Sequence, residues 1–238
     1  ILEIADPQGS QIVWIGILHD HDKPALAAVR LKSVQAKIGE IEINLAREGN
    51  PIPFGELANY KIPEGAGGDV SDRKRLSRQS LIDLANAYLD MKRANDGLVI
   101  PGFAPGCAAY DNGVRVGLEK SNDRSTTPSD CAALVRAGRY SEIRRIRDRR
   151  FPIVDPRSGL VVAYYQQDMP ARVDERKASQ RYTSFYPQTR SVVEVLRIKG
   201  GQIERIDAVS IYQPYNMPSA WGGSIRDGEC VPCASLLP

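Results

Sequence analysis

Hydrophobic and polar positions alternate along the chain in a pattern that occurs twice. Residues 192–211 alternate as two strands around a short polar turn, which predicts a hairpin with one apolar face. Residues 27–46 repeat that pattern. Arg-Leu-Lys at 30–32 corresponds to Arg-Ile-Lys at 197–199, with a gap of two residues at the turn. The pattern predicts a duplicated sheet.

The repeat extends upstream of each hairpin. An Asp-Pro turn at Asp6 precedes one apolar run, and an Asp-Pro turn at Asp155 precedes another. The second copy has a helix and some 80 residues before its sheet, whereas the first copy has neither. We therefore expect the first copy to be incomplete and to pack its apolar face on another surface, because a bare apolar face is costly. Its three predicted strands lie at about 10–18, 25–34 and 38–46.

The clearest helix signal follows Ser77, a plausible N-cap. Apolar residues recur at helical spacing from Leu81 to Leu89, and Tyr88 lies on that stripe, which favours a core position with a bonded hydroxyl. Asn95 opens a stop signal. Residues 107–116 then predict two strands joined by an Asn-Gly turn.

These signals divide the chain into four parts. A Pro- and Gly-rich stretch typical of a linker separates the two copies. The predicted parts are 1–46 (the sheet half of a first copy), 47–76 (linker), 77–221 (a complete domain) and 222–238 (a C-terminal tail).

Composition excludes several classes of function. Hydrophobic residues make up 42% and charged residues 26% of 238 residues, as in soluble globular proteins, and no apolar run is long enough to predict a membrane span. An arginine-rich stretch at 136–150 lacks interleaved aromatic residues, and the net charge is only +3, so nucleic acid is not an expected partner. The chain opens at Ile1 without a leader, and we expect a fragment or a matured chain.

Four cysteines allow three pairings. Cys107 with Cys131, and Cys230 with Cys233, would place the protein in an oxidising compartment, secreted or periplasmic. A redox or zinc site at the second pair is the competing interpretation, but no second pair of cysteines or histidines accompanies it. The only histidines lie in one polar turn, which favours a solvated turn over a metal site.

Four segments carry a resemblance to a known superfamily. They are Tyr-Asp-Asn-Gly at 110–113, Cys131, Arg-Asp-Arg-Arg-Phe-Pro-Ile-Val-Asp at 147–155 and Tyr-Asn-Met-Pro-Ser-Ala-Trp at 215–221. With the order of helix, hairpin and long strands, the chain resembles the SnoaL-like, nuclear-transport-factor-two-like superfamily, in a secreted fungal and bacterial group with tandem copies. The resemblance implies an α+β fold, a cone-shaped barrel with a strongly curved antiparallel sheet and an apolar pocket. It also implies mostly cofactor-free acid–base enzymes.

Residues present only in the second copy are the better functional candidates, because residues shared by both copies serve the scaffold. The predicted catalytic residues are Asp111 as a base and Tyr110, Tyr165 and Arg150 as donors to an oxyanion. The predicted substrate-binding residues are Arg149, Tyr164, Tyr212, Tyr215 and Trp221. A structural role competes with each: Asp111 also suits the turn, and the arginines also suit pairing with nearby acids. Neighbouring strand residues face opposite sides, so one of Tyr164 and Tyr165 at most can face the pocket.

The sequence thus predicts a cofactor-independent lyase, dehydratase or isomerase acting on a small, apolar, aromatic and oxygenated molecule. We expect neither a cofactor nor a metal. The alternative is a non-catalytic ligand-binding or assembly domain that uses the same pocket or sheet. A homodimer, or association with a missing N-terminal segment, would cover the first copy.

Overall fold

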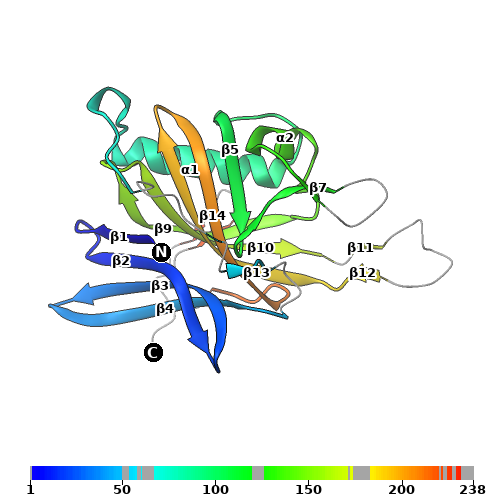
Figure 1. Cartoon of the computed structure of the whole chain (residues 1–238), viewed down its shortest axis with the longest axis horizontal. Helices are drawn as coiled ribbons and strands as arrows, with labels where there is room; N and C mark the ends of the chain where they lie inside the picture. Colours follow the sequence, from blue (N-terminus) through cyan, green and yellow to red (C-terminus); the bar gives the residue numbers. More distant parts are fainter. Residues whose placement is uncertain are drawn as a thin grey trace.

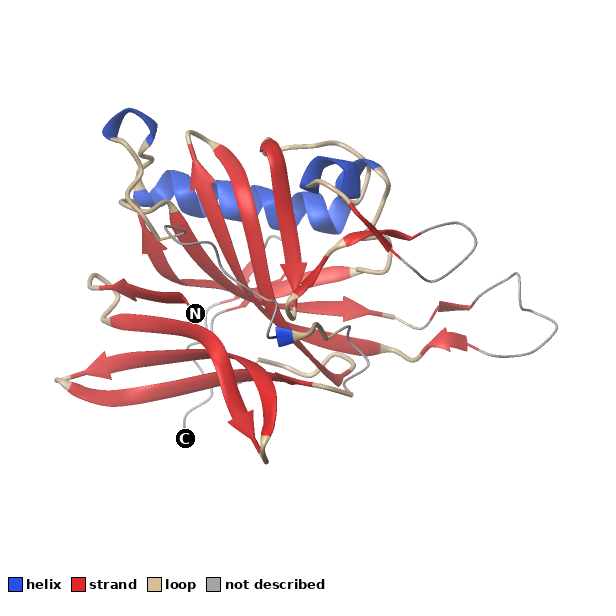
Figure 2. Cartoon of the chain, viewed as in Figure 1, coloured by secondary structure: helices blue, strands red, loops and turns tan. Residues whose placement is uncertain are grey.

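The computed structural model describes residues 2–49, 54–57, 60, 67–119, 126–170, 172–173, 183–219, 221, 224–226 and 229–231. Its fold is α+β and mostly sheet, with two large sheets stacked on one another and the longest helix lying across the far side of one of them (Figures 1 and 2). The predicted fold class, α+β, is confirmed.

The N-terminal residues form a four-stranded antiparallel sheet in the order β1-β2-β3-β4. Alternating residues produce it: Val13 and Ile15 are buried on one face while their neighbours are more exposed. Three strands were predicted here, and the fourth, β1, was missed because it is only five residues long. The strands are β1 (Leu2–Asp6), β2 (Gln11–Asp20), β3 (Lys23–Val34) and β4 (Lys37–Arg47).

The second sheet has six strands in the order β6-β5-β14-β13-β10-β9, and only the pair β14–β5 is parallel. Within the described residues this sheet is open, with β6 and β9 at its edges, so the expectation of a barrel is not met. Its strands are β5 (Phe103–Asp111), β6 (Val114–Arg115), β9 (Arg145–Asp155), β10 (Leu160–Met169), β13 (Gln188–Lys199) and β14 (Gln202–Pro214).

Helix α1 (Arg78–Ala94) begins and ends where the sequence predicted. Ser77 accepts a hydrogen bond from Ser80 N, and Asn95 takes a left-handed conformation at the C-terminus. A second helix, α2 (Cys131–Arg136), was not predicted, because its six residues are too few for a periodic signal. The remaining elements are η2 (Asp72–Lys74), β7 (Gly117–Glu119), β8 (Thr126–Pro128), β11 (Arg172–Val173), β12 (Thr183–Phe185), β15 (Ser224–Arg226) and β16 (Glu229–Val231).

Each face of the six-stranded sheet belongs to a different core. One face packs against α1 and α2, and Tyr165, Val192 and Leu196 point to that side. The other face packs against the four-stranded sheet, and Tyr164 and Val193 point there. The predicted linker contributes to the second core through Leu57, which is buried.

The two sheets share a register as well as a strand order. Gln11 pairs with Lys32 in one sheet, and Leu160 pairs with Arg197 at the equivalent place in the other. Each hairpin also carries a bulge at the equivalent position, after Lys32 and after Arg197. The register aligns Lys32, rather than Arg30, with Arg197, so the two-residue gap inferred from the sequence is wrong and the two hairpins have the same length.

The two sheets pack through equivalent faces. In the core between them, Ile15 and Ala28 of the first sheet occupy the positions that Tyr164 and Val193 occupy in the second. The four-stranded sheet thus covers one apolar face on the six-stranded sheet. Its outer face, equivalent to the face that α1 covers in the second sheet, leaves Ile41 54% exposed and Ile43 53% exposed.

Candidate functional site

A cavity of about 360 Å³ lies between the helical side of the six-stranded sheet and the segments that follow α2. Its volume falls within the range of small-molecule sites, and apolar and aromatic side chains share its wall with charged ones. The described lining side chains that carry polar chemistry are Tyr88, Lys92, Tyr110, Asp111, Arg115, Arg139, Tyr140, Glu142, Tyr165, Gln167, Arg190, Glu194 and Tyr212.

Four of these side chains form a buried hydrogen-bonded cluster. Lys92 Nζ donates to Tyr165 OH (2.8 Å) and to Glu194 Oε1 (3.2 Å). Tyr165 OH donates to Glu194 Oε2 (2.7 Å), and Tyr88 OH donates to Glu194 Oε1 (3.1 Å). Three donors therefore satisfy one carboxylate, and Lys92 still has a third N–H.

Burial shifts the ionisation of this cluster. Removal from water lowers the pKa of the Lys92 ammonium, and Glu194 opposes that shift without cancelling it. Burial, with the charge of Glu194 beside it, raises the pKa of the Tyr165 hydroxyl well above its ordinary value. The ammonium also lies 5.3 Å from the ring centroids of Tyr88, Tyr140 and Tyr165, a distance suited to cation–π attraction.

A second polar group borders the cavity at the end of β5. Asp111 accepts hydrogen bonds from Arg190 Nη2 and from Ser210 Oγ (2.6 Å for the latter). The Asn-Gly turn after Asp111 fixes it in place, because Asn112 is buried and exchanges two 2.9 Å hydrogen bonds with the backbone of Ser210. The turn thus fixes the position of the carboxylate.

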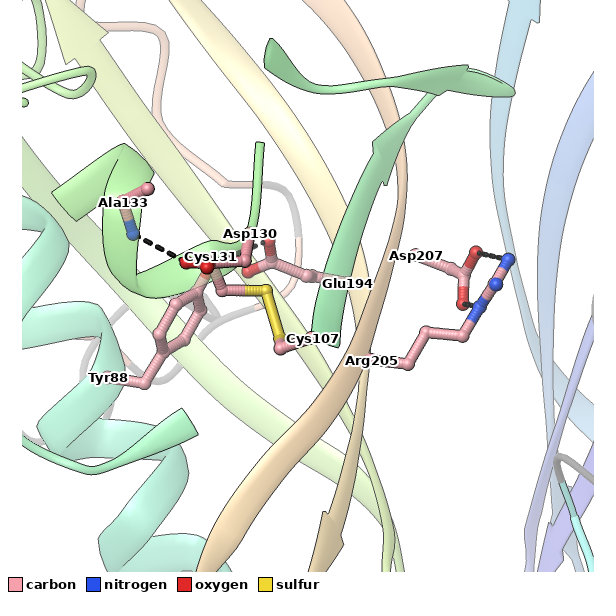
Figure 3. The surroundings of a disulfide bond; sticks show 8 residues. All are labelled: Tyr88, Cys107, Asp130, Cys131, Ala133, Glu194, Arg205 and Asp207. Atoms are coloured by element: carbon pink, nitrogen blue, oxygen red, sulfur yellow. Dashed lines mark hydrogen bonds and ion pairs between the residues drawn. A yellow bond between two sulfur atoms is a disulfide. The ribbon is translucent and has the colours of Figure 1, made fainter. Parts of the chain in front are cut away.

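The disulfide between Cys107 and Cys131 ties β5 to the start of α2. Figure 3 shows Tyr88 and Glu194 near this disulfide, whereas the side chains of Arg205 and Asp207, on β14, point away from it. This pairing is the predicted one. The second predicted pair falls outside the described residues, because Cys233 and the side chain of Cys230 are not described.

The structure brings four of the predicted residues to the cavity. Asp111, Tyr165 and Tyr212 line it, and Tyr165, not Tyr164, is the tyrosine of its pair that faces it. Tyr110 also borders the cavity, but its ring lies 4.2 Å from the Arg205 guanidinium, on the side of Tyr60.

The other predicted residues lie elsewhere. Arg150 pairs with Glu42 between the two sheets (2.6 Å), where Tyr164 also lies. Arg149 pairs with Asp90 of α1 (2.8 Å). The Trp221 ring lies 4.9 Å from the guanidinium of Arg30, and Tyr215 is 41% exposed.

Sequence reasoning missed Lys92, Glu194, Arg190, Arg139 and Tyr140. Two of them carried a detectable signal. Lys92 is a charge on the apolar stripe of α1, four residues after Tyr88, and Glu194 is a lone carboxylate in a strand that is apolar on both faces. A charge at a position that periodicity assigns to the core is a candidate functional residue.

The first sheet lacks this chemistry at the equivalent positions. By the shared register, Gly16 stands where the second sheet has Tyr165, Val29 where it has Glu194, and Ala25 where it has Arg190. The Trp14 ring fills the space over Gly16, since a Cβ there would lie 2.3 Å from it.

Among the residues that the structure describes, no helix is long and apolar enough to span a membrane. No group of three or more His, Cys, Asp or Glu side chains among them is arranged to hold a metal ion.

Comparison with known proteins identifies one family. A family described as "Domain of unknown function (DUF8021)" matches residues 74–210, more than half of the chain. No curated protein matches. Among solved structures, "Structure of AusH from Aspergillus nidulans" is similar at 12% identity and a TM-score of 0.37, covering 56% of this chain and 85% of that one. "Crystal structure of IdmH 96-104 loop truncation variant" is similar at 13% identity and a TM-score of 0.35, covering 55% and 91%. At these TM-scores neither structure informs the function of this chain.

Proposed function

The chain belongs to the DUF8021 family, and we propose that it is a cofactor-independent acid–base enzyme acting on a small, aromatic, oxygenated molecule. The observation that carries the proposal is the buried Lys92–Glu194 pair, with Tyr165, at the wall of a cavity. A buried ion pair stabilises a fold less well than apolar packing of the same volume, so stability alone does not account for it. The resemblance to the SnoaL-like superfamily supports the same class of chemistry.

The two polar groups suggest two roles. Asp111, held by Arg190 and Ser210, would accept a proton from a carbon next to a carbonyl group. Lys92 would place its third N–H on the carbonyl oxygen and stabilise the negative charge that develops there. Glu194 and Tyr165 would act as positioning residues that hold the ammonium in place.

The resulting enolate has two outcomes that need no cofactor. Reprotonation at another carbon is an isomerisation. Expulsion of a group on the neighbouring carbon is an elimination, as in a dehydratase or a lyase. The apolar wall would exclude water and strengthen the electrostatic interactions in the cavity. The Cys107–Cys131 disulfide supports a secreted or periplasmic location for this chemistry.

Proton abstraction can be tested before the substrate is known. A panel of aromatic ketones and β-hydroxy ketones is incubated with the protein in D₂O, and loss of the α-proton signal is followed by NMR. We expect wild type to accelerate exchange for at least one compound. Asp111→Asn should abolish the acceleration, and Lys92→Met should reduce it at least about 100-fold, as for loss of a donor to an oxyanion.

Glu204→Gln is the matched control, because this carboxylate pairs with Arg197 away from the cavity. It should exchange like wild type. The proposal fails if no compound exchanges faster than in buffer, or if Asp111→Asn exchanges as fast as wild type. Circular dichroism of each variant separates lost chemistry from lost folding.

Assembly is a second candidate function, and the exposed isoleucines on the outer face of the four-stranded sheet favour it. Four strands of about ten residues, at ~3.3 Å per residue and ~4.8 Å spacing, give a face of roughly 600 Å². Two such faces would bury about 1,200 Å², the lower end of specific interfaces. We propose a second copy as the occupant, contacting Ile41 and Ile43, which are about half exposed.

Sedimentation velocity tests this contact. We expect a dimer for wild type at about 100 μM and a monomer for the double variant Ile41→Lys, Ile43→Lys. Ile100→Lys changes an equally apolar residue that is 68% exposed elsewhere, and it should remain dimeric. A monomeric wild type at that concentration would rule assembly out.

A further inference from the structure

One cation that borders the cavity lacks an acceptor in the described part of the chain. Arg139 is held by its backbone, whose N–H donates to Leu134 O (3.1 Å) after α2. Its guanidinium makes no hydrogen bond or ion pair with any described residue, and its Nε is buried. A buried donor without an acceptor is costly, so its retention calls for an explanation.

A second guanidinium borders the same cavity with bonding capacity to spare. Arg190 uses Nη2 for Asp111 and Ser210, whereas its Nε has no acceptor among the described residues. The charge of Arg139 opposes the rise in the pKa of Tyr140, and the charge of Arg190 adds to the lowering of the pKa of Lys92. The Lys92 ammonium lies 5.3 Å from the centroid of the Tyr140 ring.

The lining has more positive than negative charge. Among the residues that the structure describes, four cationic side chains and three acidic ones border the cavity, and Lys92 and Arg190 each pair with one of the acids. Arg115 is exposed, and Arg139 forms no ion pair with Glu142, the third acid, or with any other described carboxylate. Burial raises the pKa of Tyr140 and of Tyr165, so these two hydroxyls stay neutral and supply no negative charge.

We infer that the cavity takes a ligand with one carboxylate on an aromatic framework, and that Arg139, with Arg190 of the same cavity wall, binds that carboxylate. A guanidinium presents paired N–H donors that match the two oxygens of a carboxylate. The tyrosine rings around the cavity suit an aromatic framework, and a single surplus positive charge suits a monoanion rather than a phosphate ester. The inference rests on the proposed function for its cavity and specifies the class of substrate.

Matched ligands isolate the carboxylate. Isothermal titration compares 4-hydroxycinnamate and 2-naphthoate with their uncharged amides at pH 7, using the whole chain with its disulfide intact. For wild type we expect at least one acid to bind about 10- to 100-fold more tightly than its amide, as for hydrogen bonds to a charged group. Arg139→Met should remove most of that preference, and Arg139→Lys should keep part of it.

Arg136→Met is the control, because Arg136 is exposed on the last turn of α2. It should bind the acids as wild type does, and thermal unfolding confirms that each variant is folded. The inference fails if the amides bind as tightly as the acids, if no acid binds at 1 mM, or if Arg139→Met retains the preference. Should neutral ketones exchange their α-protons while no acid binds, the enzyme proposal stands and this inference falls. If acids bind, and their binding depends on Arg139, but no compound exchanges its α-protons, this inference stands and the enzyme proposal falls.

Discussion

Removal of the Glu194 charge is the sharpest test of the buried cluster. Glu194→Gln keeps an acceptor for Tyr88 and Tyr165 but leaves the Lys92 ammonium without a counter-charge. Both side chains of the pair are less than about a tenth exposed, so water does little to screen the loss. Breaking such a buried pair costs about 3–5 kcal/mol, a large part of the stability of an ordinary domain.

The double variant Lys92→Met, Glu194→Gln provides the matching measurement. It removes both charges and keeps the amide acceptor, so we expect stability within about 1 kcal/mol of wild type. Urea unfolding at pH 7, followed by circular dichroism with the disulfide intact, gives the free energies. The difference between the single and double variants measures the coupling.

The pH dependence of Glu194→Gln follows from Lys92. Burial already lowers the pKa of Lys92, and Glu194 is the main group that holds it up. Without Glu194 the folded state binds fewer protons than the unfolded state between the lowered pKa and the ordinary value. Stability therefore rises with pH across that window. The deficit of the variant should be full near pH 7 and should shrink as the pH approaches about 10.

Three outcomes would refute this reasoning. The first is a loss below about 1 kcal/mol in Glu194→Gln, since the pair would then behave like an exposed one. The second is a double variant that loses the sum of the two single variants, which would mean that the charges do not interact. The third is a deficit that grows with pH.

Three more predictions concern the scaffold. Asp168 should contribute stability that is lost as the pH falls below about 4, because hydrogen bonds from Arg147 and others hold its pKa low against the opposing effect of burial; Asp168→Asn should flatten acid unfolding in that range. Replacing Cys107 and Cys131 with serine should cost about 3.5 kcal/mol, from the entropy of a loop of ~25 residues, measured by urea unfolding against the oxidised protein. Glu42→Gln should destabilise by roughly 3 kcal/mol in thermal unfolding, because it removes the carboxylate that pairs with Arg150 and leaves Arg30 with Glu40 alone.

The sequence alone determined the local elements, because their signals come from neighbouring residues. Ser77 and Asn95 mark the ends of α1, and the Asn-Gly turn at Asn112 joins β5 to β6. The two-residue alternation of a strand also predicted that Tyr164 and Tyr165 face opposite sides of the sheet, as they do. Each of these features depends on residues only a few positions apart, so it does not depend on how distant segments pack.

Only the tertiary structure decided which side chains meet. Lys92 and Glu194 are 102 residues apart, and Glu42 and Arg150 are 108 apart, so their contacts depend on the order and stacking of the sheets. The pairing of β10 with β9 has register shifts, and Arg149 and Arg150 of β9 pair with acids away from the cavity. Periodicity predicts which side of a helix or strand is buried. Whether that side meets a core, a second sheet or a cavity depends on packing between segments that are distant in the chain.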